Sequence, residues 1–133
     1  MSRSGEVMVL DDESMVCEHL QGPLTEKGYN VETFTDSQQA LERLDAKRFD
    51  VVVTDLKMKP PTGLDLLRTI RTQSPSTQVI IITGYASIES AHEAESGDVF
   101  AFVNKPFKIK ELVSLVGKAS RKAARERSRE AAP

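Results

Sequence analysis

The chain has 133 residues and a formal net charge of −2, with 39% hydrophobic and 29% charged residues. This is the size and composition of one soluble globular domain. No apolar run approaches the roughly 20 residues of a membrane-spanning helix, and the N-terminus lacks the apolar core and cleavage site of a secretory signal. Cys17 is the one cysteine, which excludes an internal disulfide and a Cys-rich zinc site and fits a cytoplasmic protein.

Charge is distributed unevenly along the chain. Residues 1–117 contain 12 Lys/Arg and 18 Asp/Glu, whereas residues 118–133 contain six Lys/Arg and two Glu. The body is therefore mildly acidic and the C-terminal segment is basic. Residues 121–132 consist mostly of good helix formers and could extend a last helix. Because they offer little apolar surface for burial, we expect them to project or fray.

The first predicted strand is Val7–Leu10, a short apolar segment of strand length. Apolar residues at helical spacing follow over residues 16–24 and predict a helix. Pro23 lies inside this helical pattern. An interior proline removes a backbone hydrogen bond at a cost of about 3 kcal/mol. We therefore expect a kink or a break at Gln21–Pro23.

The second predicted strand is Val31–Phe34, and the helix after it begins at Asp36, a side chain suited to an N-cap. The third is Val51–Thr54, in which three consecutive valines are not interrupted by polar residues. Such continuous apolar runs are typical of parallel strands covered on both faces. Lys59-Pro60-Pro61 then predicts a stiff loop, and a new helical pattern follows Gly63.

The fourth predicted strand is Val79–Thr83, again apolar without alternation, and a helical pattern follows Ser87. The fifth strand is Val99–Val103, and the last clear apolar stripe at helical spacing covers residues 109–116. A strand followed by a helix thus occurs five times. This order indicates a doubly wound α/β domain with a parallel sheet.

Reactive side chains follow the predicted strands where each strand ends. They are Asp11, Asp12 and Glu13 after the first strand, Asp55 after the third, Thr83 at the end of the fourth, and Asn104-Lys105-Pro106 after the fifth. Sites in parallel α/β sheets form at the carboxyl ends of the strands, so we expect these residues to converge. Clustered carboxylates repel one another, which a divalent cation relieves, and oxygen ligands alone favour Mg²⁺.

Such a cluster suits aspartyl-phosphate chemistry. One carboxylate can attack a phosphoryl group while the metal neutralises charge, Lys105 supplies a second cation and Thr83 donates a hydroxyl. Each residue also has an ordinary structural explanation, since Asp-Asp after a strand is often only a turn or a helix cap. Because these residues all stand at the ends of different strands, a shared phosphorylation site is favoured over separate structural roles.

With these motifs the chain resembles the receiver domains of bacterial response regulators, over about residues 5–118. The segments that carry the resemblance are Val-Met-Val-Leu-Asp-Asp-Glu (7–13), Val-Val-Val-Thr-Asp-Leu-Lys-Met (51–58), Gly63–Leu67, Ile-Ile-Ile-Thr-Gly-Tyr-Ala-Ser (80–87) and Lys105-Pro106-Phe107. The resemblance implies a CheY-like (βα)5 flavodoxin-like fold with a five-stranded parallel sheet in the order 2-1-3-4-5. Residues 119–133 would then be a basic helical extension, a linker or a disordered tail.

The same resemblance implies a phosphoacceptor and a metal site. Asp55 would be the phosphoacceptor. Asp12 would bind Mg²⁺ directly and Asp11 largely through water. The backbone carbonyl of Lys57, together with Asp55, would complete the protein's share of the metal ligands.

Further roles are implied for residues around the phosphoacceptor. Thr83 matches the switch hydroxyl, and Lys105 the phosphate-contacting lysine before a peptide bond that is usually cis. Phe102 stands at a switch position often held by Tyr or Phe. Because Phe has no hydroxyl, packing alone would drive its rotation. Lys57 and Tyr85 would flank the path of the attacking water and tune the lifetime of the phosphoryl group.

The expected function is a two-component signalling switch. A histidine kinase or phosphotransfer protein would phosphorylate Asp55, and the face formed by the fourth helix, fifth strand and fifth helix would change shape. That face would bind a partner or form a homodimer. The effector is unknown and no membrane partner is expected. Apart from slow autodephosphorylation there is no turnover, so we do not expect an enzyme.

Three alternatives stay open. The basic segment Arg121–Arg129 could contact nucleic acid, which its lack of aromatic residues and the acidic body disfavour. A HAD-like Asp-dependent phosphatase commonly has a second Asp two residues after the nucleophile, where this chain has Lys57. A flavodoxin-like cofactor binder would need a phosphate-cradling loop after the first strand, which is missing.

Overall fold

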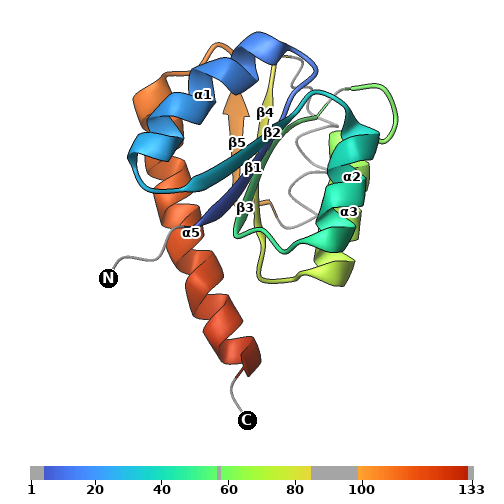
Figure 1. Ribbon diagram of the computed structural model, residues 1–133, viewed down its shortest axis with the longest axis vertical. Helices are drawn as coiled ribbons and strands as arrows, with labels where there is room; N and C mark the ends of the chain where they lie inside the picture. The colour runs from blue at the N-terminus through green and yellow to red at the C-terminus, as the bar shows by residue number, and fades with distance from the viewer. Residues whose placement is uncertain (1–4, 57, 85–98, 132–133) are drawn as a thin grey trace.

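A computed structural model describes residues 5–56, 58–84 and 99–131 (Figure 1). The strands are β1 (Glu6–Leu10), β2 (Asn30–Phe34), β3 (Val51–Asp55), β4 (Gln78–Thr83) and β5 (Ala101–Asn104). They form one parallel sheet in the order β2-β1-β3-β4-β5. The predicted strands, their parallel pairing and their order are therefore confirmed, with the fifth strand beginning two residues later than expected.

Helices flank the sheet on both faces (Figure 1). The described helices are α1 (Ser14–Glu26), α2 (Ser37–Ala46), α3 (Gly63–Gln73) and α5 (Ile109–Ala131). The helix predicted after Ser87 lies outside the described residues. In the described part of the chain, no helix is both long and apolar enough to cross a bilayer.

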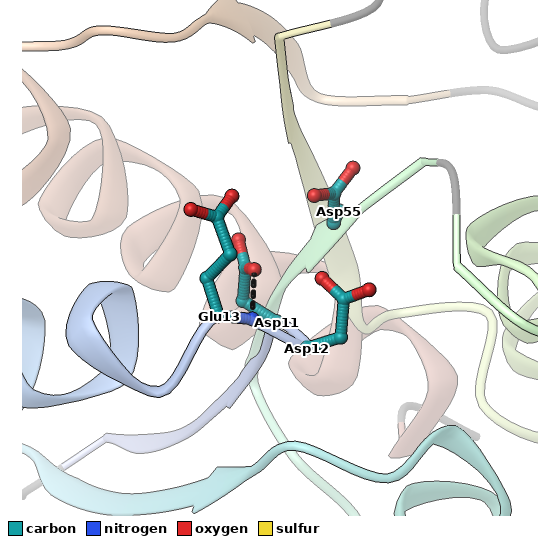
Figure 2. Close-up of side chains that lie close together, drawn as sticks. All are labelled: Asp11, Asp12, Glu13 and Asp55. Carbon is teal, nitrogen blue, oxygen red and sulfur yellow. Dashed lines mark hydrogen bonds between the residues drawn. The ribbon is translucent and has the colours of Figure 1, made fainter.

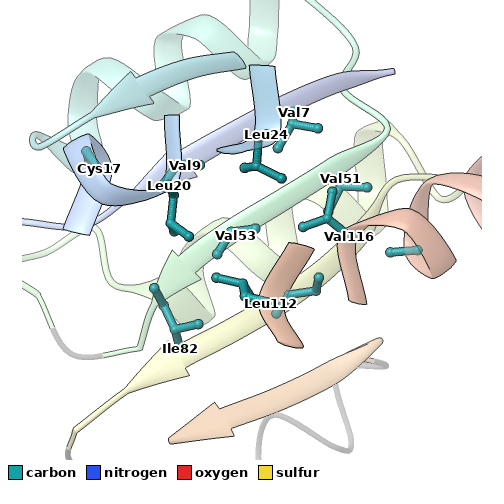
Figure 3. Close-up of a cluster of buried hydrophobic side chains, with 12 residues drawn as sticks. Val7, Val9, Cys17, Leu20, Leu24, Val51, Val53, Ile82, Leu112 and Val116 are labelled. Atoms are coloured by element: carbon teal, nitrogen blue, oxygen red, sulfur yellow. The ribbon is translucent and has the colours of Figure 1, made fainter. Parts of the chain in front are cut away.

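The core is divided into two layers by the sheet. Val51 and Val53 of β3 pack against α1 and α5 on one face (Figure 3), whereas Val52 packs against α2 and α3 on the other. Successive side chains of a strand point to opposite faces, so a strand between two helical layers must be apolar at every position. This is the physical reason for the continuous valine and isoleucine runs in β3 and β4.

Of the kink or break expected near Gln21–Pro23, the break is wrong and the kink stays a prediction. Helix α1 continues to Glu26 with Pro23 inside it. Leu20 and Leu24 are fully buried on either side of the proline, and each buried leucine contributes about 1.5–3 kcal/mol, enough to offset the lost bond. The carbonyl that loses its partner belongs to exposed His19, where water can replace the missing donor.

Side chains cap two of the helices. As predicted, Asp36 is the N-cap of α2, and its carboxylate accepts a hydrogen bond from the backbone N–H of Gln38 at 2.8 Å. Helix α3 begins with a capping box, in which Thr62 and Asp65 each accept a hydrogen bond from the other's backbone N–H. The Thr-x-x-Asp spacing of residues 62–65 encodes this box.

Helix α5 continues without interruption through the basic segment to Ala131. Leu112, Val116, Ala119 and Ala123 are buried along one face of this helix. The expectation that this segment frays is therefore wrong for residues 121–131, although its last turns do extend beyond the sheet (Figure 1). The division of the chain into a domain and an extension at residue 118 stays a prediction.

Polar contacts hold the last turns of α5 against the amino ends of the strands. Glu126 accepts a hydrogen bond from Gln78 Nε2 at 3.0 Å, and Arg127 forms an ion pair with Asp50. Asp50 also accepts a hydrogen bond from the backbone N–H of Glu6 at 2.7 Å. Side chains far apart in the sequence thus replace the apolar burial that the segment lacks.

Candidate functional site

The strand register brings the predicted site residues to one edge of the sheet. Leu10 of β1 pairs with Thr54 of β3, so the next residues, Asp11 and Asp55, lie side by side at the carboxyl ends of their strands. On the other side of β3, Asp55 pairs with Ile82, one residue before Thr83.

Pairing of β4 with β5 extends this edge to Lys105. Thr83 pairs with Asn104, and the backbone N–H of Lys105 donates to the carbonyl of Thr83 at 2.8 Å. The Lys105–Pro106 peptide bond is cis, as the resemblance implied. Lys105 is thereby held directly after the end of β5, the strand next to β4.

Four carboxylates form a cluster at this edge (Figure 2). One oxygen of each of Asp11, Asp12, Glu13 and Asp55 lies within 4.8 Å of the others. Asp11 and Asp55 are buried, whereas Asp12 and Glu13 are exposed. Glu13 was noted in the sequence but given no role. Its position beside the Asp-Asp pair was the signal that could have included it.

Backbone contacts fix the position of Asp11. Its N–H donates to the carbonyl of Phe34 at 3.0 Å, which continues the pairing of β1 with β2 by one residue. Its Oδ1 accepts from the N–H of Glu13 at 2.8 Å (Figure 2). Both hydrogen bonds are local consequences of the strand end and the tight turn into α1, so Asp11 is held rigidly at the base of the cluster.

Lys105 is the cation of the cluster. Its Nζ lies 2.7 Å from Asp11 Oδ2, 3.0 Å from Asp55 Oδ2 and 3.0 Å from Glu13 Oε1. Burial alone would lower the pKa of Lys105, but its hydrogen bonds to the carboxylates outweigh burial and raise that pKa above its usual value. The side chain is therefore an ammonium at neutral pH.

One ammonium does not neutralise four carboxylates. Burial raises the pKa of Asp11 above its usual value, against the opposing effects of Lys105 and of the Glu13 N–H. A site with excess negative charge and only oxygen donors suits a hard divalent cation. The cluster therefore fits Mg²⁺, which Asp11, Asp12 and Asp55 would hold. Lys57, whose carbonyl was expected to complete the ligands, lies outside the described residues.

The start of α3 packs directly against the backbone of Asp55. The N–H of Gly63 donates to the carbonyl of Leu56 at 3.2 Å. A Cβ at residue 63 would lie 2.3 Å from the carbonyl oxygen of Asp55 and 3.0 Å from the Cα of Leu56. Only glycine fits this approach, so Gly63 belongs to the framework that positions the Asp55 carboxylate.

The two predicted switch residues lie on neighbouring strands. Thr83 is fully buried at the end of β4. Phe102 is half-buried in the middle of β5, where it pairs with Ile81 and packs against the core layer that contains Val52. Tyr85, the predicted lifetime-tuning residue, lies outside the described residues.

Comparison with known sequences gives one family. The family model for the response regulator receiver domain matches residues 7–117. The chain is 36% identical over 115 residues to the DNA-binding transcriptional regulator NtrC of Escherichia coli K12 and 35% identical over 107 residues to the transcriptional regulatory protein ZraR of Klebsiella oxytoca. These matches cover 86% and 80% of this chain but 24% of each relative, so the chain spans about a quarter of their length.

Solved structures give the same architecture. A receiver domain protein from Methanospirillum hungatei superposes with a TM-score of 0.88 at 22% identity, covering 93% of this chain and 99% of that one, a likeness of fold alone. The beryllofluoride-activated NtrC4 receiver domain dimer superposes with a TM-score of 0.82 at 29% identity, covering 89% and 98% of the two chains.

Proposed function

The chain belongs to the response regulator receiver family of two-component signalling proteins, and we propose that Asp55 accepts a phosphoryl group from a histidine kinase or a phosphotransfer protein. One observation carries the proposal. The buried carboxylate of Asp55 lies 3.0 Å from the Lys105 ammonium and within a cluster of four carboxylates that fits a divalent cation.

The clustered aspartates differ in their surroundings. Asp11 is buried at the base of the cluster, where it accepts a hydrogen bond from the Glu13 N–H at 2.8 Å and lies 2.7 Å from Lys105. Asp12 is exposed at the rim, where it can hold a metal but is not enclosed. Asp55 is both enclosed and beside a cation, which are the conditions under which charge on a transferred phosphoryl group is stabilised.

In the proposed step a carboxylate oxygen of Asp55 bonds to phosphorus. The phosphorus–nitrogen bond to the donor imidazole breaks, and the imidazole leaves with the electron pair. Lys105 contacts phosphoryl oxygens through its ammonium as negative charge develops on them. Mg²⁺, when bound, supplies further neutralisation of those oxygens. The product is an aspartyl phosphate, so the chain is itself the substrate of a phosphorelay.

Phosphorylation then acts as a switch. The new group adds a charge of about −2 and acceptor oxygens, and the Thr83 hydroxyl donates to one of them. Movement of Thr83 leaves room that Phe102 fills by packing. The face formed by β5, α5 and the helix predicted after Ser87 rearranges and binds the next partner. The relatives NtrC and ZraR are transcriptional regulators by name. We propose that this chain likewise acts upstream of an effector that regulates transcription.

A protein donor is favoured over a small metabolite by one exposed side chain. Met15 is 62% exposed and is the only large hydrophobic side chain so exposed within the described ranges. It lies in the first turn of α1, two residues after Glu13. An apolar contact beside a polar reaction centre is typical of protein recognition. Histidine kinases act on soluble receivers in the cytoplasm, so we expect the protein there.

The proposal includes slow loss of the phosphoryl group and no turnover of an external substrate. Lys57 and Tyr85 would set the rate of that loss by controlling access of water. Because residue 57 is Lys, the chain lacks the second Asp that a HAD-like phosphatase uses as general acid. The beryllofluoride-activated NtrC4 receiver is a dimer, and we propose that phosphorylation likewise promotes a homodimer of this chain.

The test is phosphorylation by acetyl phosphate with and without Mg²⁺, read by intact mass and by size-exclusion elution. We expect the wild-type chain to gain one phosphoryl group only with Mg²⁺, and to elute earlier. Asp55→Asn should gain none, whereas Asp45→Asn, which changes an exposed carboxylate on α2, should behave as wild type. Equal phosphorylation of the two variants would overturn the assignment of Asp55.

A further inference from the structure

In the basic segment of helix α5, the two carboxylates and the row of exposed cations lie on different faces. On the inner face, the buried row of Leu112, Val116, Ala119 and Ala123 is followed by Glu126, Arg127 and Glu130, which contact the rest of the domain. Glu126 accepts a hydrogen bond from Gln78 at 3.0 Å, and Glu130 forms an ion pair with Arg48 at 3.6 Å. Both carboxylates of the segment therefore have partners on the rest of the domain, although Glu130 is exposed.

The charged side chains on the outer face of the same turns are all cations. Lys118, Arg121, Arg125 and Arg129 are exposed, at helical spacings of three, four and four residues. At about 1.5 Å per residue they form a row about 17 Å long. None of them takes part in an ion pair with a carboxylate in the described part of the chain. We call these four residues the basic row.

The basic row lies away from the acidic cluster. Helix α5 starts near the carboxyl edge of the sheet, and Lys118 is nine residues further along it, about 14 Å by helical rise. The remaining turns extend beyond the amino ends of the strands (Figure 1). Because charges in physiological salt are screened over about 8 Å, the acidic cluster does not cancel the field of the row.

The chemistry of the row identifies its partner. Protein interfaces have an apolar core and membrane-surface helices an apolar face, whereas the one large exposed hydrophobic side chain within the described ranges, Met15, is on α1. A second copy that met this row with its own row would place cations against cations. Three of the four residues are Arg, whose planar guanidinium binds phosphate through paired hydrogen bonds. We propose that the basic row binds the phosphate backbone of duplex nucleic acid without sequence preference.

The absence of aromatic residues from the basic segment does not exclude a duplex as its partner. Aromatic side chains stack on the bases of single strands, but phosphate contacts to a duplex need only positioned cations. The contacts of the inner face with Asp50 and Gln78 supply that positioning.

The test is fluorescence anisotropy of a labelled, mixed-sequence DNA duplex with the full, unphosphorylated chain at several salt concentrations. At 50 mM salt we expect binding with a Kd on the order of 10⁻⁴ M or tighter. Arg121→Gln/Arg125→Gln should weaken it by about tenfold per cation and reduce the slope of log K against log salt by about 2. Lys59→Gln/Arg68→Gln, an exposed pair elsewhere, should leave both unchanged.

Three outcomes would overturn the proposal: no binding at 50 mM salt, equal weakening by both double variants, or competition by poly-glutamate as effective as that by unlabelled duplex. The last would identify an acidic protein as the partner. Because the measurement uses unphosphorylated protein, its failure is independent of whether Asp55 accepts a phosphoryl group.

Discussion

At the scale of single residues, the site depends on how closely backbone and side chains approach Asp55. Lys105 contacts three carboxylates at 3.0 Å or less, and Gly63 leaves no room for a side chain beside the Asp55 carbonyl. A small change at either position would move the proposed nucleophile relative to its cation. Side chains at the rim, such as Met15, would instead affect which donor can approach.

Gly63→Ala is expected to destabilise the fold by about 1–3 kcal/mol and to slow phosphorylation by acetyl phosphate, because the new Cβ would displace the Asp55 backbone. Urea unfolding and intact mass measure the two effects. Gly22→Ala is the matched control, since a Cβ there meets nothing within 4 Å and lies inside α1. That change should stabilise by about 0.5–1 kcal/mol. Equal effects of the two substitutions would contradict this account.

Met15→Glu is expected to slow phosphoryl transfer from a cognate phosphohistidine donor while leaving transfer from acetyl phosphate unchanged. The side chain is exposed beside the cluster and would contact a protein donor but not a small one. Parallel rates with the two donors check this. A comparable loss with acetyl phosphate would mean that Met15 supports the site itself.

At the scale of elements, polar contacts decide where the helices end and how they dock. The end of α5 is held by Asp50, and the edge strand β2 is tied to α2 through Glu32. Glu32 accepts from Arg43 at 2.8 Å and from Lys47 at 2.8 Å. Lys47 also reaches Glu6 of β1 at 2.7 Å, so one lysine links two strands to one helix.

The contact between Arg127 and Asp50 is expected to stabilise the whole domain, not only the last turns of α5. Urea unfolding of Arg127→Ala, Asp50→Ala and the double variant should give a coupling free energy of about 1 kcal/mol or more. Asp50 is nearly buried and also holds the start of β1. A coupling of zero would mean that the last turns of α5 are independent of the sheet.

The Glu32 contact predicts a specific loss of stability in acid. The hydrogen bond from Arg43, with a further contribution from Lys47, lowers the pKa of Glu32 to about 2, against the opposing effect of burial. A carboxyl whose pKa is lowered by folding stabilises above its unfolded pKa, and that stabilisation is lost as the pH falls from about 4.3 toward about 2. The stability difference between wild type and Glu32→Gln, from urea unfolding at each pH, should shrink over this window. A constant difference would contradict the assignment.

At the scale of the whole molecule, charge is separated along the long axis. The carboxylates gather at one edge of the sheet, and the basic row extends past the opposite edge on α5. The repulsion within the acidic cluster lowers the free energy of unfolding unless a divalent cation binds. The two ends of the molecule therefore suit different partners, a divalent ion with a phosphodonor at one and a polyanion at the other.

Millimolar Mg²⁺ is expected to raise the Tm of the wild-type protein, because a ligand that binds only the folded state stabilises it by mass action. Asp12→Asn should reduce this rise while raising the Tm without metal, since it removes one repelling charge. Thermal unfolding with NaCl at matched ionic strength separates specific binding from screening. An equal rise with NaCl would show that the cluster holds no specific ion.

Most of the fold and much of the site were predictable because their signals are local. The valine and isoleucine runs predicted the strands, and their continuity predicted helices on both faces. The carboxyl ends of such strands must meet at one edge, so Asp11, Asp12, Asp55, Thr83 and Lys105 could be grouped without coordinates. The resemblance to receiver domains added the strand order and the cis bond at Pro106.

The tertiary structure decided what depends on partners distant in sequence. Pro23 is tolerated because Leu20 and Leu24 are buried, and residues 121–131 stay helical because Asp50 and Gln78 meet them. The sequence by itself determined which segments form strands and helices, because hydrophobic periodicity depends only on neighbouring residues. It also determined which reactive side chains stand at the strand ends. Only the packed structure decided which face of α5 became basic, since the burial of the opposite face selects it.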